Sequence, residues 1–196
     1  TDSDKIQYYR YQAIKYLRTE LRETYYEQAA LVSQSLAGIM KTLMIKRLES
    51  SFAAFKISLK NLTTATERML EMFDNGKVLI APDLSVNDLM DKGFSAEELE
   101  QRILELSIEN PKNNVFSSED FDEQFIEGLK KDYALLQELL AAWSKIGYDP
   151  KIDTFLTKLK NELLNREINP TGKLVVFTES TDTANYLTQK IEKFLE

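Results

Sequence analysis

The sequence predicts a mainly α protein: a bundle of long helices, a short extended segment near residues 77–81, and a strand–helix unit at the C-terminus. Three observations lead to this prediction. The first proline is Pro82, so the stretch before it lacks the strongest helix breaker. Apolar residues recur at helical spacing from Leu43 to Phe73. Near the C-terminus, the four-residue apolar run Leu174–Phe177 is typical of a strand buried on both faces.

Two helices are expected before residue 43. The stretch KIQYYRYQAIKYL, residues 5–17, follows Ser3 and Asp4, either of which can cap a helix. The predicted inner face of this helix consists of Ile6, Tyr9, Ala13 and Leu17. The second helix, LRETYYEQAALVSQSLAGIM, covers residues 21–40, and Gly38 is the position where it could be interrupted.

One helix is predicted from Leu43 to Phe73, because its apolar residues fall on a single stripe at about 100° per residue. The stripe consists of Met44, Leu48, Phe52, Phe55, Leu59, Leu62, Met69 and Phe73. The sequence DNG ends the helix, since Asn75 or Gly76 can adopt the left-handed conformation of a C-terminal cap. The run KVLIAP then predicts a short extended segment that stops at Pro82.

Residues 83–123 are predicted to form an acidic insertion. The wider segment 73–135 holds 15 acidic and 6 basic residues. A capping box at Ser95–Glu98 starts a helix that ends before Pro111. Another helix is expected from Ser117 or Ser118 to about Lys145, before Gly147. Four carboxylates stand at its start and suit the positive end of the helix dipole better than a calcium loop: Glu119, Asp120, Asp122 and Glu123.

The C-terminal part contains two further helices and the predicted strand. Asp149 is a cap followed by Pro150 at the first helical position. The inner face of that helix is predicted to hold Ile152, Phe155, Leu159 and Leu163. Residues 165–172 are read as a linker, residues 173–178 as a buried strand, and residues 181–195 as the helix that follows it.

The amino-acid composition excludes several common classes of catalytic and metal-binding site. The chain has no His and no Cys, which removes Ser-His-Asp and Cys-His catalysis, the usual zinc sites and disulfides. Any metal would need oxygen ligands, and we expect no cofactor bound by this chain alone. No apolar stretch approaches the ~18 residues of a membrane span. The N-terminus lacks a signal core, and with no Cys a reducing cytoplasm is the expected location. The missing initiator Met fits an excised or processed piece.

Two GK pairs, in PTGKL and NGKV, do not fit a phosphate-binding loop. That motif needs a Gly five residues before the pair and a hydroxyl residue after the Lys. In PTGKL these positions hold Glu167 and Leu174. We therefore expect no nucleoside triphosphate site in this chain.

Two groups of residues could meet phosphate. Lys46, Lys56 and Lys60 lie within about 80° of one another on a continuous helix, although a solvated face explains such a pattern more simply. Thr178, Ser180 and Thr181 stand at the C-terminal end of the predicted strand, where open α/β sheets bind ligands. Helix capping by Thr181 is an equally good explanation of the second group.

Two stretches, LMIKRLESSFAAFKISL and GKLVVFTESTDTANYL, resemble segments of bacterial Swi/Snf-type superfamily-two helicase-like ATPases. The first is similar to a helix that precedes the second RecA-like lobe of those proteins, and the second to the strand that opens that lobe. The N-terminal YYRYQAIKYL resembles the region before the helix. The matched stretches cover about a quarter of the chain, whereas the acidic insertion matches nothing in the family.

The resemblance implies a parent protein that hydrolyses ATP with magnesium between two lobes and translocates along DNA. Residues 1–170 would be its helical inter-lobe region, and residues 171–196 the start of its C-terminal lobe. The signature helix, Lys46, Arg47, Leu48, Glu49, Ser50 and Ser51, would couple the lobes. Thr178, Ser180 and Thr181 would stand where the second lobe touches the nucleic-acid backbone. The phosphate loop, the acidic magnesium motif and the arginine-bearing motif are absent from this chain, so it is not the catalytic unit.

Three functions follow as hypotheses. The leading one is a non-catalytic helical region of an ATP-dependent helicase or DNA translocase, whose partners are the two motor lobes and DNA. The alternative is a helical protein-interaction module without enzymatic activity, with the acidic segment as its partner-binding element. A stand-alone enzyme built on a carboxylate pair has little support, since no two acids share a distinctive setting.

Overall fold

The protein is mainly α-helical, as predicted. The computed structural model describes residues 5–22, 26–80, 98, 101–102, 105 and 114–195. Its long helices are α2 (Tyr26–Ser50), α3 (Phe52–Asp74), α6 (Glu123–Ser144) and α8 (Thr181–Leu195). Its shorter elements are a 3₁₀ helix at Tyr9–Tyr16 (η2), α1 (Thr19–Arg22), β1 (Lys77–Ile80), β2 (Asn114–Ser117), a 3₁₀ turn at Ser118–Asp120 (η3), α7 (Pro150–Lys158) and a π-helical turn at Leu159–Leu163 (η4).

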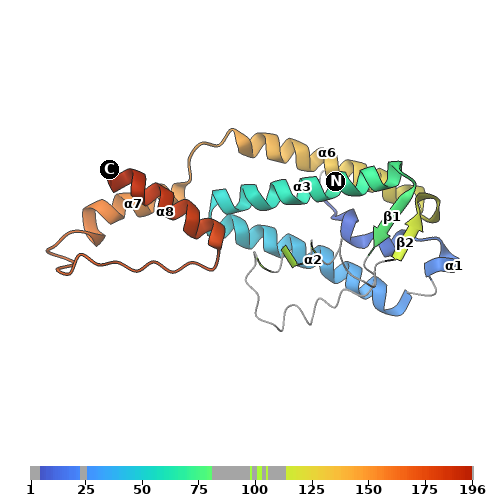
Figure 1. Ribbon diagram of the computed structural model, residues 1–196, viewed down its shortest axis with the longest axis horizontal. Coiled ribbons are helices and arrows are strands. Elements are labelled where there is room, and N and C mark those ends of the chain that lie inside the picture. Colours follow the sequence, from blue (N-terminus) through green and yellow to red (C-terminus); the bar gives the residue numbers. More distant parts are fainter. Residues whose placement is uncertain are drawn as a thin grey trace.

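The molecule is elongated (Figure 1). Helices α2, α3 and α6 run lengthwise beside one another, with β1 and β2 at one end and α7 and α8 at the other. Across the described ranges, no helix has both the length and the apolar character that a bilayer-spanning segment requires. Ser3, Asp4, Ser95 of the predicted capping box and most of the acidic insertion lie outside the described residues.

The predicted continuous helix from Leu43 to Phe73 is wrong, because Ser51 divides it into α2 and α3. Ser51 is extended (φ −163°, ψ 157°), and its hydroxyl accepts a hydrogen bond from the amide of Ala54 at 3.0 Å, which caps α3. Helix α3 then turns back alongside α2. Both parts of the apolar stripe still lie in the core. The apolar faces of α2 and α3 pack against each other, since Met44 of α2 and Phe55 of α3 belong to the same buried cluster.

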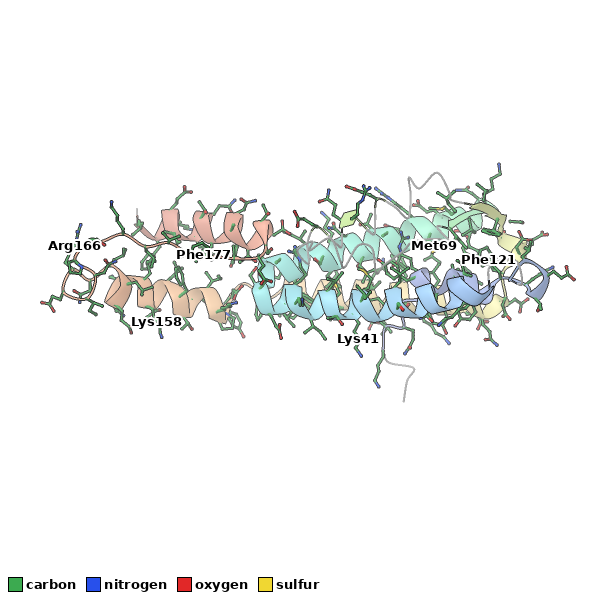
Figure 2. The ribbon with its side chains drawn as sticks, turned by 90° about the horizontal axis from the view of Figure 1, so that it is seen from below. Lys41, Met69, Phe121, Lys158, Arg166 and Phe177 are labelled. Atoms are coloured by element: carbon green, nitrogen blue, oxygen red, sulfur yellow. The ribbon has the colours of Figure 1, made fainter. Side chains whose placement is uncertain are left out.

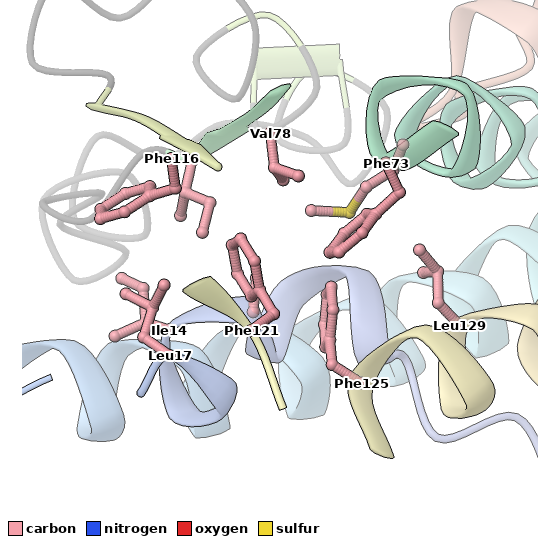
Figure 3. Packing of buried hydrophobic residues seen from close by; sticks show 11 residues of the cluster. Ile14, Leu17, Phe73, Val78, Phe116, Phe121, Phe125 and Leu129 are labelled. Carbon is pink, nitrogen blue, oxygen red and sulfur yellow. The ribbon is translucent and has the colours of Figure 1, made fainter. Parts of the chain in front are cut away.

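Two apolar clusters fill the bundle. The first lies towards α7 and α8, and its buried members are Tyr11, Leu36, Met40, Leu43, Met44, Phe55, Leu59, Leu62 and Leu136. The second lies beneath the two strands and is rich in aromatic rings (Figure 3). There the rings of Phe73, Phe121 and Phe125 have centroids 5.0 to 5.4 Å apart. These two clusters form the main apolar core of the protein, which lies within the bundle of α2, α3 and α6.

The predicted extended segment at residues 77–81 is confirmed for residues 77–80, which form β1, and residue 81 lies outside the described part of the chain. It pairs antiparallel with β2, with Val78 opposite Phe116 in the register. Gly76, at φ 73°, supplies the left-handed residue that the DNG sequence predicted at the end of α3. Val78 is fully buried against the aromatic cluster, so the small sheet closes that end of the bundle.

The N-terminal stretch is helical but not α-helical. It forms η2, which ends before Leu17. The predicted Ala13 and Leu17 are buried, but so are Tyr11 and Ile14, whereas the predicted Ile6 and Tyr9 are half-buried. Residues three apart eclipse one another in a 3₁₀ helix, which explains why the α-helical period predicted a partly wrong inner face.

A buried carboxylate anchors this stretch. Asp132 of α6 is 3% exposed and accepts hydrogen bonds from the amides of Gln7 and Tyr9, both at 2.7 Å. Burial raises the pKa of the Asp132 carboxyl, and the amides act in the opposite direction. Between these two amides, Tyr8 adopts φ 59°, a left-handed conformation that is rare for a bulky residue.

Of the helix starts predicted at residues 117–150, the Asp149 cap is confirmed, whereas the start of the long helix at Ser117 or Ser118 is wrong. Ser117 and Asp120 form a capping box around η3, and Asp122, rather than a serine, caps α6 through the amide of Gln124 at 2.8 Å. Asp149 caps α7, with Pro150 at its first position. Gly38, by contrast, does not interrupt α2.

The C-terminal helix is confirmed at Thr181–Leu195, but the buried strand before it is wrong. Residues 173–178 are extended, pair with no strand among the described residues, and are exposed throughout. Phe177 is 89% exposed, and it lies at the end of the molecule opposite Met69 and Phe121 (Figure 2).

The two glycines inside long helices should respond to alanine in opposite ways. A Cβ at Gly128 would lie 2.3 Å from the Tyr9 ring, whereas a Cβ at Gly38 would meet nothing within 4 Å. We expect Gly128→Ala to lower the free energy of unfolding by about 1–3 kcal/mol through overpacking. Gly38→Ala should raise it by roughly 0.5–1 kcal/mol through helix propensity. Urea unfolding of both variants checks this, and the same sign for both would contradict the packing of Tyr9 on α6.

Tyr8 should make the protein sensitive to base. Burial, with Tyr11 and Asp132 nearby, raises the pKa of Tyr8 to about 12 from 10.0. The native state therefore keeps this proton while the unfolded chain loses it. The contribution of Tyr8 to stability is complete below pH 10 and is lost as the pH rises from 10 through 12.

Replacing Tyr8 by Phe removes this ionisation. The free energy of unfolding should then fall less steeply between pH 10 and 12, by up to about 1.4 kcal/mol per pH unit. The measurement is urea unfolding across that range. Tyr148→Phe, at a side chain that is 65% exposed, is the control. Equal slopes for Tyr8→Phe and the wild type would refute the assignment.

Candidate functional site: the helix-end junction

The two stretches that carry the family resemblance meet in space. The RLESS sequence forms the last turn of α2 and the cap of α3, and the segment 178–183 forms the start of α8. Four helix ends converge here, namely the C-terminus of α2 and the N-termini of α3, α7 and α8 (Figure 1). We call this region the helix-end junction and define it by Arg47, Ser50, Ser51, Ser58, Asp149, Lys151, Ser180, Asp182 and Thr183.

Arg47 is the central residue of the junction. Its side chain is only 2% exposed, although it carries a full positive charge. Nε donates to Ser58 Oγ of α3 at 2.8 Å, and one terminal nitrogen donates to Ser180 Oγ at 2.7 Å. The other terminal nitrogen forms an ion pair with the carboxylate of Asp182 in α8. The planar guanidinium thus joins three helices through a fork of donors that a lysine cannot reproduce.

Serine and threonine hydroxyls surround this ion pair. Thr183 Oγ1 lies 2.7 Å from Ser50 Oγ and 2.9 Å from Ser51 Oγ, within hydrogen-bond distance of both. Ser180 Oγ also accepts from the amide of Thr183 at 3.2 Å and so caps α8. The sequence predicted Thr181 as this cap, but Thr181 is exposed and Ser180 takes the role. The hydroxyls of Ser51 and Ser180 therefore both cap a helix and join it to another element.

Asp149 serves two helices at once. Its carboxylate accepts from the amides of Lys151 and Ile152 at 3.2 and 3.4 Å, at the start of α7. The other carboxylate oxygen accepts from the amide of Phe52 at 2.8 Å, at the start of α3. Negative charge stabilises helix N-termini, so one buried aspartate fixes the mutual position of both.

Lys151 binds the remaining helix end of the junction, the C-terminus of α2. Its Nζ donates to the last carbonyls of α2, those of Glu49 at 2.8 Å and Ser50 at 3.3 Å. A cation at a helix C-terminus is favourable for the same dipolar reason. The junction is thus held by charges matched to helix ends rather than by an apolar core.

A pocket of about 780 Å³ opens beside the junction. Helix α2 contributes Lys46 and Glu49, α7 contributes Lys151 and Phe155, and residues 176–180 form another wall. Both signs of charge and several apolar side chains face this space. Among the described residues, no group of three acidic side chains is arranged to hold a metal ion.

The predicted phosphate-facing lysines do not form one stripe. Lys46 lies near the end of α2, whereas Lys56 and Lys60 lie on α3 beyond the turn at Ser51. Lys56 Nζ donates to the carbonyl of Ile146 at 2.5 Å, so it is engaged in holding the end of the α6 segment. Lys46 and Lys60 are exposed. The helical count that grouped the three lysines fails because the helix breaks.

The three hydroxyl residues at the predicted strand end separate as well. Ser180 is buried and bonded to Arg47. Thr178 and Thr181 are exposed, and Thr178 Oγ1 accepts from the amide of Ser180 at 3.3 Å. Of the signature helix, Leu48 packs against the first apolar cluster and Glu49 is exposed.

The GK pair at residues 172–173 does not have the geometry of a phosphate-binding loop. Gly172 (φ 63°) stands in a turn closed by a hydrogen bond that its amide donates to the carbonyl of Asn169, with the Arg166 guanidinium against it. An extended segment follows the GK pair, whereas a phosphate loop leads into a helix N-terminus.

The sequence did not predict the bonds of Ser58 and Thr183 in the junction, nor that Asp149 also binds the N-terminus of α3. Ser58 lies mid-helix among apolar residues, where only its buried position reveals a polar partner. The pairing of Arg47 with Asp182 spans 135 residues and leaves no local signal. No protein-family model matches this chain, and comparison with curated proteins and with solved structures found no match.

Replacing Arg47 by Lys should destabilise the protein by about 2–3 kcal/mol, because charge is kept but the fork of donors to Ser58, Ser180 and Asp182 is lost. Urea unfolding measures this. The reciprocal exchange Lys46→Arg, at the exposed neighbouring residue, is the control and should change stability by less than about 0.5 kcal/mol. Equal effects of the two exchanges would show that the buried network contributes nothing.

Proposed function

We propose that this chain is a non-catalytic helical region of an ATP-dependent helicase or DNA translocase, which couples the two motor lobes. The observation that carries the proposal is the direct bonding of Arg47 to Ser180 and Asp182. Arg47 belongs to one family-like stretch and the two acceptors belong to the other. The two stretches that resemble separate segments of one family are thus joined by a single network of side-chain bonds.

The role of the junction follows from its bonds. Helix α8 would belong to the C-terminal lobe, and α2 and α3 to the inter-lobe bundle. Because Arg47 and Thr183 connect α8 to both bundle helices, a movement of α8 would be transmitted to the bundle. ATP and magnesium would be bound by the lobes of the parent, and a cytoplasmic location is part of the proposal.

DNA is the second partner in this proposal. Lys46 and Lys60 are exposed, as are Thr178 and Thr181 near the pocket. Cationic and hydroxyl side chains contact phosphates without reading sequence. Lys56 is a poorer candidate because its ammonium already holds the Ile146 carbonyl.

The test is DNA-stimulated ATP hydrolysis by the complete polypeptide, whose sequence should contain GxxxxGK[ST] before this region and an arginine-bearing motif after it. Replacing Lys46 and Lys60 by Glu should lower the stimulation, most strongly at low salt, and leave DNA-independent hydrolysis unchanged. The control is Lys193→Glu, an exposed lysine near the end of α8. Absence of the flanking motifs, or stimulation that no variant alters at any salt concentration, would overturn the proposal.

A second candidate function is a protein-interaction module without enzymatic activity. The observation that favours it is the exposed apolar run Leu174–Phe177, since contiguous exposed apolar residues mark interaction sites. This candidate predicts binding to a protein partner and no effect of DNA.

A further inference from the structure

The segment 173–179 is exposed and belongs to no strand of the described residues, and only Lys173 at its start has backbone groups bonded to neighbouring side chains, those of Asn169 and Thr171. Its four apolar residues are all exposed: Leu174 41%, Val175 73%, Val176 43% and Phe177 89%. No backbone hydrogen bond joins residues 174–177 to another described segment. An extended, apolar backbone whose amides and carbonyls are not bonded to other described backbone is a template for pairing with another strand.

We propose that this segment pairs antiparallel with the same segment of a second copy of the chain, about a twofold axis at Val176. A twofold interface is self-complementary, so every contact between two residues occurs twice. The sequence of the segment, KLVVFTE, fits this requirement in one register.

Charge selects the register. With Val176 opposite its own copy, Lys173 of one chain lies opposite Glu179 of the other at both ends of the ladder. Opposite charges directly across an antiparallel pair are stabilising. Parallel, in-register stacking would instead place lysine against lysine and glutamate against glutamate, which disfavours fibrils relative to the dimer.

The apolar residues agree with the same register. Val175 of one chain lies opposite Phe177 of the other, an aromatic and β-branched pair of the kind that stabilises antiparallel sheets. These pairs fall on one face of the ladder, because side chains alternate along a strand. The pairing would cover the two most exposed residues of the run.

The dimer should be weak. One short ladder buries less surface than the ~1,200 Å² at the lower end of stable interfaces. We expect a dissociation constant on the order of 10 µM to 1 mM. The inference does not rest on the proposed role in a DNA translocase.

A charge exchange tests the register in the 196-residue chain. Sedimentation equilibrium across that concentration range should show a monomer–dimer equilibrium. Lys173→Glu and Glu179→Lys should each weaken it on the order of tenfold, since each single variant places like charges opposite one another at both ends. The double variant should restore the wild-type constant. The control is Lys193→Glu, which changes charge outside the segment and should have no effect.

Cysteine crosslinking tests the twofold axis, since the chain has no Cys of its own. Val176→Cys should form a disulfide-linked dimer under mild oxidation, because position 176 faces its own copy. Leu174→Cys should not, because its two copies would be about 14 Å apart along the strands. A mixture of Leu174→Cys and Thr178→Cys chains should again crosslink.

Several results would overturn the inference. They are a monomer at every concentration, an oligomer that the single charge reversals leave unchanged, and equal crosslinking at positions 174 and 176. A different protein bound at this edge, with the chain otherwise monomeric, would also overturn it. Circular dichroism of each variant verifies that the helices remain folded. None of these outcomes bears on DNA-stimulated ATP hydrolysis, so the two proposals fail separately.

Discussion

The burial of one guanidinium constrains the architecture of the α7–α8 end of the molecule. A charge taken out of water must recover its lost hydration from fixed partners, and Arg47 does so with acceptors on α3 and at the start of α8. Those acceptors stand in place only when α2 ends at Ser50, α3 begins at Phe52 and α8 begins at Thr181. The positions of three helix ends are therefore linked through one side chain.

The two ends of the protein are stabilised by different physical means. Beneath the strands, aromatic rings and aliphatic side chains exclude water, and the contacts there depend little on direction. At the helix-end junction the described contacts are hydrogen bonds and the Arg47–Asp182 ion pair, which demand particular distances and angles. Directional contacts of this kind favour a defined arrangement of helices over a set of similar ones. This difference suits a bundle that holds its own shape and a junction that sets the position of α7 and α8.

Local chemistry in the sequence was sufficient for much of the fold. Capping residues such as Asp149, the glycine after α3 and the helical spacing of apolar residues predicted the helices and β1. The turn at Ser51 was missed because the apolar period runs through it unchanged, and both halves of the stripe face the same core. The strand at residues 173–178 was predicted to be buried because an apolar run does not reveal whether a partner exists to cover it. In the junction, the resemblance pointed to Arg47, Ser50 and Ser51, but Ser58 and Thr183 depend on contacts across the fold that no spacing encodes.

The single non-helical residue between α2 and α3 has a mechanical consequence. Because only Ser51 separates them, α2 and α3 are joined without a flexible linker, and a change of angle at the turn would move each helix as a unit. Helix α3 has 23 residues and is about 34 Å long. A tilt of about 10° at the junction would thus displace the far tip of that helix, where β1 begins, by roughly 6 Å. If the proposed coupling holds, the turn at Ser51 would be the pivot through which a displacement of α8 moves the far end of α3.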